Sequence, residues 1–155
     1  MTRLHVVIPA YRAVQDLAAC LASVERNSAP GTAVLVADDA SPEAEVGAVV
    51  AQFIERGALA LRYVRRAHNL GFVGNVNAAF GETAPDDLVL LNSDTEVTPG
   101  WLDRLRECAD SDPRIATITP WSNNAEICSF PDFCRAAPMP EDAAALASAA
   151  RACGP

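Results

Sequence analysis

The amino-acid sequence predicts an α/β fold in which helices flank a mostly parallel sheet. Short apolar runs rich in Val, Ile and Leu alternate along the chain with longer segments whose apolar residues recur every three or four positions. The first pattern is typical of buried strands and the second of amphipathic helices. Strands that alternate with helices form βαβ units, which have parallel strands and right-handed crossovers.

The first βαβ unit is expected near the start of the chain. Residues 4–8 form an apolar run rich in β-branched side chains and closed by Pro9, which predicts a strand. Residues 14–26 keep apolar side chains at helical spacing, so we expect a helix. The run 33–37 is apolar throughout and predicts the second strand.

The alternation continues with a second helix and a third strand. Ser41 followed by Pro42 is typical of a helix N-cap and a first helical residue, so a helix is expected over 42–56. Residues 59–64 predict the third strand.

A glycine-bearing loop, residues 69–74, is expected to lead into a helix over 75–80. The loop follows the third strand rather than the first and lacks the first glycine of a dinucleotide fingerprint, which argues against that motif. Residues 87–91 predict the fourth strand.

The last third of the chain is expected to hold two helices and one strand. Thr98 and Pro99 repeat the cap-plus-proline pattern and predict a helix that ends near residue 110. Residues 114–119 predict a fifth strand, and the alanine-rich segment 142–152 predicts a final helix.

Length and composition exclude several classes of protein. The 155 residues suit one domain, and a net charge of −8 argues against a nucleic-acid partner. All twelve basic residues are arginine, so a Walker phosphate loop, a Schiff-base lysine and a lysine general base are excluded. The sequence shows neither a membrane span nor a signal peptide, and its five cysteines have no metal-binding spacing, so we expect reduced thiols in a cytoplasmic protein.

Acidic residues end two of the predicted strands. Asp38 and Asp39 follow the second strand, and Asp94 follows the fourth. If the first strand lies between those two, the chain reverses direction beside it and leaves the crevice where open α/β sheets bind ligands. A Mg²⁺ ion commonly takes only one or two protein carboxylates and completes its shell with water and phosphate oxygens. Asp94 alone is therefore enough to hold a metal–diphosphate, although a turn aspartate is the competing interpretation.

Neighbouring side chains leave further alternatives open. Asp38 and Asp39 cannot both face the same way, so one is expected to face a ligand while the other braces the turn. Arg65, Arg66 and His68 end the third strand, where they would either meet a phosphate or form an exposed basic cluster.

Together these segments resemble the family-2 glycosyltransferases, inverting enzymes of the GT-A fold, and among them bacterial rhamnosyltransferase-like and polysaccharide members. The resemblance covers residues 4–131 and depends on the order and spacing of several short motifs. These are Val6-Val7-Ile8-Pro9-Ala10-Tyr11, Asp38-Asp39-Ala40-Ser41-Pro42, Asn69-Leu70-Gly71-Phe72 with Asn75 and Asn77, Leu91-Asn92-Ser93-Asp94-Thr95 and Pro99-Gly100-Trp101-Leu102.

The resemblance implies roles for several of the matching residues. Asp39 would contact the nucleotide base, and Asp94 would bind the Mg²⁺ or Mn²⁺ that bridges the sugar-nucleotide diphosphate. Asn92 stands where the first aspartate of the metal motif is usual, which leaves Asp94 as the main ligand. The substrate-binding residues it implies are Pro9, Ala10, Tyr11, Asp39, Asn69, Gly71, Asn75, Asn92 and Ser93.

The family's general base is a carboxylate in an acidic motif downstream of the metal motif. Glu126, Asp132 and Glu141 do not stand in a similar context, so the base is expected beyond residue 155. We therefore expect residues 1–155 to be an incomplete GT-A domain that binds a UDP- or dTDP-sugar. It would serve transfer to a saccharide, lipid-linked or glycoconjugate acceptor, in the cytoplasm or at the inner membrane face through a larger polypeptide.

Proteins of other classes compete with this interpretation. The first is a nucleotide-sugar-binding module without catalytic activity. The second is a response-regulator receiver, which places its acid pair after the first strand and needs a lysine, and this chain has neither.

Overall fold

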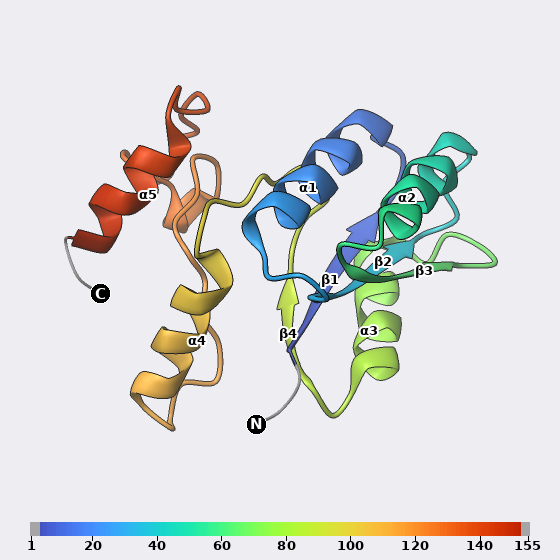
Figure 1. The fold of residues 1–155 in the computed structure, drawn as a ribbon, viewed down its shortest axis with the longest axis horizontal. Helices are drawn as coiled ribbons and strands as arrows, with labels where there is room; N and C mark the ends of the chain where they lie inside the picture. Colours follow the sequence, from blue (N-terminus) through green and yellow to red (C-terminus); the bar gives the residue numbers. More distant parts are fainter. Residues whose placement is uncertain (1–3, 153–155) are drawn as a thin grey trace. The chain divides into compact units, whose positions relative to one another are not determined.

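The computed structural model describes residues 4–152, and the chain divides into two compact units. The first unit extends to Val97 and contains the sheet, and the second begins at Thr98. Figure 1 shows the helices and strands of both units.

The first unit is built on a four-stranded parallel sheet with the strand order β3-β2-β1-β4. Its strands are β1 (Leu4–Ala10), β2 (Ala33–Asp38), β3 (Ala60–Arg65) and β4 (Asp87–Leu90). The four predicted strands of this unit and the predicted parallel pairing are therefore confirmed. Because β1 lies between β2 and β4, the chain moves to one side of β1 and then returns to the other, which is the predicted point of reversal.

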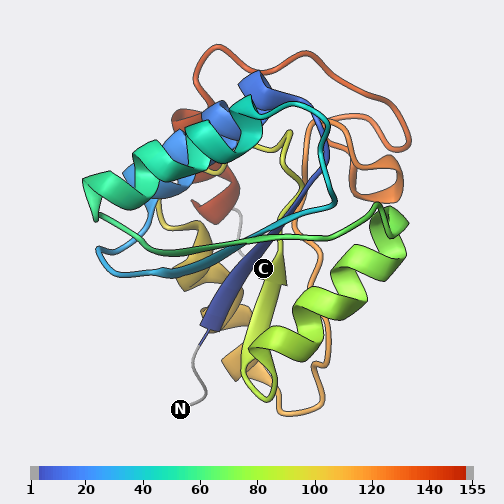
Figure 2. The same ribbon diagram turned by 90° about the vertical axis from the view of Figure 1, so that its right-hand side faces the viewer.

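Helices cover both faces of the sheet, as buried parallel strands require. The helices are α1 (Val14–Asn27), α2 (Glu45–Arg56) and α3 (Gly71–Thr83). Helices α1 and α2 lie side by side on one face, and α3 covers the other (Figure 2).

The strand residues alternate between these two layers. Val7 and Leu35 are buried against Ala79 of α3. Ile8 and Val36 have no exposed surface and point to the opposite face, where Leu17 of α1 is also completely buried. This core fixes the carboxyl ends of the strands, from which the functional loops leave.

The second unit contains α4 (Trp101–Ser111), the short 3-10 helix η1 (Glu126–Cys128) and α5 (Ala143–Ala152). The prediction of the final helix is confirmed, and the side chain of Asp142 accepts a hydrogen bond from the backbone nitrogen of Ala145 at its start. None of the helices in the described residues has the length and apolarity of a membrane span.

The prediction of a fifth strand over 114–119 is wrong. Within residues 4–152 this segment pairs with no strand, and most of it is exposed, including Ile115 at 37%. A run with β propensity becomes a strand only where a sheet edge is there to pair with it, because propensity largely reflects packing and pairing.

Three helix starts also differ from the predictions. Helix α2 begins at Glu45, and Ser41 is not its N-cap because its hydroxyl accepts a hydrogen bond from the backbone nitrogen of Arg12. Helix α3 begins at Gly71, so residues 71–74 of the expected loop form its first turn. Helix α4 begins at Trp101 after Gly100, whose φ of 73° suits glycine.

Candidate functional site

A pocket with a volume of about 540 Å³ opens where the loops after β1, β2 and β4 meet the start of α3. This volume lies within the range of about 300–1,000 Å³ that is typical of ligand sites. Its lining residues are Pro9, Ala10, Tyr11, Ala13, Asp16, Asp39, Asn69, Gly71, Phe72, Asn75, Asn92, Ser93 and Asp94. The structure thus brings together all ten residues that the sequence suggested, and their roles stay predictions.

Asp39 connects three of the loops around the pocket. Its Oδ1 atom accepts a hydrogen bond of 2.7 Å from the backbone nitrogen of Leu70, and its own backbone nitrogen donates to the Ala10 carbonyl at 2.8 Å. The Asn69 side chain donates to its carbonyl at 3.3 Å. Among the described residues, hydrogen bonds engage only Oδ1 of the carboxylate, so Oδ2 is available to a ligand.

Asp38 lies with its side chain among protein groups and is not part of the pocket lining. Its carboxylate accepts hydrogen bonds from the Ser41 backbone at 2.9 Å and the Tyr63 hydroxyl at 2.5 Å, and it pairs with Arg65 at 3.3 Å. Burial, followed by the hydrogen bond to Asp38, raises the pKa of Tyr63 well above its ordinary value. The geometry has Asp38 brace the turn while Asp39 faces the pocket.

Left-handed backbone conformations gather beside the pocket. Arg12, Ala13 and Ala40 have φ angles of 61°, 49° and 58° although none is glycine. Such conformations cost roughly 1–2 kcal/mol per residue and persist where surrounding contacts hold them, often at functional sites. Here the hydrogen bond of 2.9 Å from the Arg12 nitrogen to the Ser41 hydroxyl ties the two loops together.

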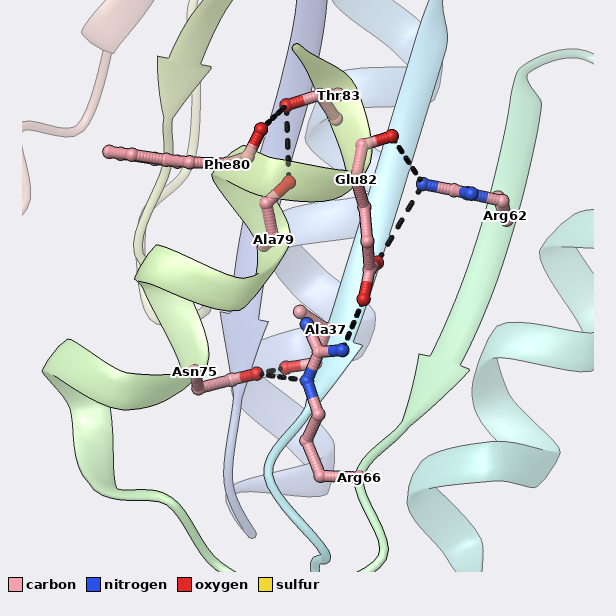
Figure 3. A network of polar contacts seen from close by, with 8 residues as sticks. All are labelled: Ala37, Arg62, Arg66, Asn75, Ala79, Phe80, Glu82 and Thr83. Carbon is pink, nitrogen blue, oxygen red and sulfur yellow. Dashed lines mark hydrogen bonds and ion pairs between the residues drawn. The ribbon is translucent and has the colours of Figure 1, made fainter.

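Asn75 lines the pocket with its polar atoms already engaged by the protein (Figure 3). Its Nδ2 donates to the Ala37 carbonyl at 2.7 Å, and its Oδ1 accepts from Nε of Arg66 at 2.8 Å. Arg66 also pairs with Glu82. The side chain therefore fastens α3 to the end of β2 and shapes the pocket wall.

The structure places the basic cluster outside the pocket. Arg65 pairs with Asp38 and donates to the Ser41 carbonyl, while Arg66 is held by Asn75 and Glu82. The exposed His68 does not line the pocket either. These contacts favour a structural role for both arginines over contact with a phosphate.

Asp94 is exposed at the pocket wall, on the segment that follows β4. No group of three or more His, Cys, Asp and Glu side chains in residues 4–152 could hold a metal ion. A Mg²⁺ ion needs only one or two carboxylates when phosphate oxygens and water supply its other ligands. The single carboxylate of Asp94 therefore fits a cation that binds together with a diphosphate.

Sequence reasoning missed three lining residues, Ala13, Asp16 and Phe72. Each is a near neighbour of a residue that was identified, so extending the loops by one helical turn would have found them. Asp16 lies in the first turn of α1, where the sequence showed only an acidic residue suited to a helix start.

The sequence model of Glycosyl transferase family 2 matches residues 5–127, which is most of the 155-residue chain. The chain belongs to this family. No relative was found among curated protein sequences.

Two solved structures show the fold of this family-2 chain. The mannosyltransferase PcManGT from Pyrobaculum calidifontis, in complex with GDP-Man and Mn²⁺, is 22% identical with a TM-score of 0.65, over 74% of this chain and 34% of its own. TarS from S. aureus, in complex with UDP-GlcNAc, is 21% identical with a TM-score of 0.59, over 70% and 31%. The chain thus spans about a third of each structure, and the predicted GT-A-like α/β fold is confirmed.

Proposed function

We propose that this family-2 domain binds a UDP- or dTDP-sugar through a divalent cation, for inverting transfer of the sugar to a polysaccharide or glycoconjugate acceptor. The observation that carries the proposal is one pocket lined by Asp39 from the end of β2 and Asp94 from beyond β4. The reaction would take place in the cytoplasm, with any attachment to the inner membrane face made through a larger polypeptide.

The charge of the pocket supports a metal-dependent donor. Its described lining includes the carboxylates of Asp16, Asp39 and Asp94 and no basic side chain. A diphosphate would be repelled by three carboxylates, so it needs a cation between them. A bound Mg²⁺ or Mn²⁺ would supply charge neutralisation for the leaving diphosphate. Asp94 is the residue that would hold it.

The Asp39 environment supports recognition of a pyrimidine base. Its Oδ1 is occupied by the Leu70 amide, and Oδ2 would accept the imino N–H of uracil or thymine. Pro9, Ala10 and Tyr11 form the adjacent wall against the nucleoside. We expect UDP or dTDP to bind better than GDP or ADP, and the comparison with GDP is the decisive one because guanine also carries an imino N–H.

A thermal-shift panel tests the function directly. The chain is heated with UDP, dTDP, GDP or ADP, each with Mn²⁺ or with EDTA. We expect UDP or dTDP to stabilise the chain more strongly with Mn²⁺ than with EDTA. Equal shifts for all nucleotides, or the same shifts in EDTA, would contradict the proposal. A sugar-nucleotide hydrolysis assay then distinguishes a transferase from a donor-binding module without catalysis.

A further inference from the structure

Helix α1 presents three polar side chains to the segment that contains Asp94. Cys20, Ser23 and Asn27 are three and four positions apart, so they lie on one face of the helix. The segment that leaves β4, residues 92–97, runs along this face (Figure 1).

Hydrogen bonds fasten the segment at both of its ends. The backbone nitrogen of Val97 donates to Oγ of Ser23 at 3.0 Å, and the Val97 carbonyl accepts from Nδ2 of Asn27 at 2.9 Å. At the other end, the thiol of Cys20 lies 3.7 Å from the Asn92 carbonyl that it donates to. Both backbone polar groups of Val97 are therefore satisfied by side chains of α1.

Ser23 is oriented for this contact. Its hydroxyl donates to the Cys20 carbonyl at 2.8 Å, which directs a lone pair toward Val97. The residue is 1% exposed, so water does not compete for the oxygen. An acceptor fixed in this way holds the backbone of the segment at a defined distance from α1.

Between the two fastened ends, the segment is held by backbone contacts of Thr95, one of them with the Cys20 thiol. A turn hydrogen bond of 3.1 Å joins the Thr95 nitrogen to the Asn92 carbonyl, and Asp94 itself is exposed. The first turn of α1 contributes Asp16 to the pocket wall, directly after the loop with Tyr11. One helix thus forms part of the wall and fixes both ends of the segment that carries the acid.

We propose that Ser23 and Asn27 are positioning residues that hold Asp94 in place for the metal–diphosphate, a role that rests on the function proposed above. Neither side chain lines the pocket. They act through the backbone of Val97, which keeps the segment 92–97 ordered before the cation binds. Binding of the cation to Asp94 then does not have to order this segment. Losing either contact costs metal-dependent affinity and leaves the nucleoside part of the pocket as it was.

The test compares UDP affinity with Mn²⁺ and with EDTA by isothermal titration calorimetry. The ratio of the two dissociation constants is the metal enhancement. Ser23→Ala removes the acceptor, Asn27→Ala removes the donor, and Asn27→Asp keeps the shape while placing an oxygen against the Val97 carbonyl. Groups that hydrogen-bond a metal ligand directly are typically worth about 10–100-fold in metal affinity. Ser23 and Asn27 act through the backbone of Val97, so we expect each variant to lower the enhancement by about tenfold, the lower end of that range.

Matched controls separate positioning from loss of stability. Thr83→Ala removes a hydroxyl that is buried like that of Ser23 and donates within α3, and Asn77→Ala removes an exposed amide from the same helix. Both controls should keep the wild-type enhancement, and all variants should keep the wild-type affinity for UDP in EDTA.

Two results would overturn the inference. Wild-type enhancement in all three α1 variants would limit Ser23 and Asn27 to a structural role. An equal loss in Thr83→Ala would assign the effect to general stability. If the unmodified chain shows no enhancement by Mn²⁺, the proposed function itself fails, and this outcome is distinct from the other two.

Discussion

The Oδ1 atom of Asp39 lies 2.7 Å from the backbone nitrogen of Leu70 and accepts its hydrogen bond. This contact joins the end of β2 to the residue that precedes α3, since α3 begins at Gly71. One carboxylate oxygen thus fixes the wall of the pocket, and the other is left for a ligand. Two substitutions of Asp39 can therefore separate its contact with Leu70 from its contact with a ligand.

Asp39→Asn keeps an oxygen for the Leu70 amide but places an amide N–H against the imino N–H of a pyrimidine. Asp39→Ala removes both acceptors. Because a buried donor without a partner costs about 1–3 kcal/mol, we expect both variants to lose that much UDP affinity in calorimetry with Mn²⁺. Only Asp39→Ala should also lower the melting temperature. Unchanged UDP affinity in both variants would show that Asp39 does not contact the base.

Asp94→Ala should remove the stabilisation that Mn²⁺ and UDP confer together and leave the fold intact. The side chain is exposed, so its loss does not disturb the core. Ligand at about 100 times its dissociation constant stabilises a protein by about 2.7 kcal/mol, which a thermal-shift measurement resolves. Glu96→Ala, an exposed acid of the same segment, is the matched control and should keep the shift. An equal shift in Asp94→Ala would assign the metal elsewhere.

The sheet and the strand-end acids could be predicted because each is a local pattern. An apolar run such as 4–8 or 33–37 contains within itself the signal for a buried strand, although β1 continues through Pro9 to Ala10. The parallel order follows from the βαβ rhythm, which leaves few topologies. The pocket then follows from the position of β1 between β2 and β4.

The features that the sequence could not predict depend on partners that are far away along the chain. Ser41 has the local context of an N-cap, but its hydroxyl is taken by Arg12, 29 positions away. Asn75 matched the family as a pocket residue, whereas its amide is engaged by Ala37, 38 positions away. The segment 114–119 has strand propensity and no partner strand among the described residues. In each case the local pattern left the partner undetermined.

Asn75→Ala should destabilise the first unit by about 1–3 kcal/mol. The substitution leaves the Ala37 carbonyl and Nε of Arg66 without the side chain that hydrogen-bonds to both. These groups lie at the buried contact between α3 and β2 (Figure 3). Chemical denaturation measures the difference. Asn77→Ala makes the same chemical change at an exposed site of α3 and controls for helix propensity. Equal stability of the two variants would show that the network around Asn75 adds nothing to the fold.

Cys20 should resist alkylation in the folded protein far longer than Cys134. Burial, then the negative charge of Asp94, raises the pKa of the Cys20 thiol to about 12, from an ordinary value of 9.0. A raised thiol pKa means that less of the reactive thiolate is present at any pH below it, so the reaction at pH 8 to 9 should be slow. Cys134 is an exposed free cysteine and should react faster than Cys20. Iodoacetamide labelling followed by mass spectrometry of the peptides gives both rates in one sample. Denaturant should bring the Cys20 rate up to that of Cys134, and comparable rates in the folded state would show that α1 does not enclose Cys20 beneath the Asn92 segment.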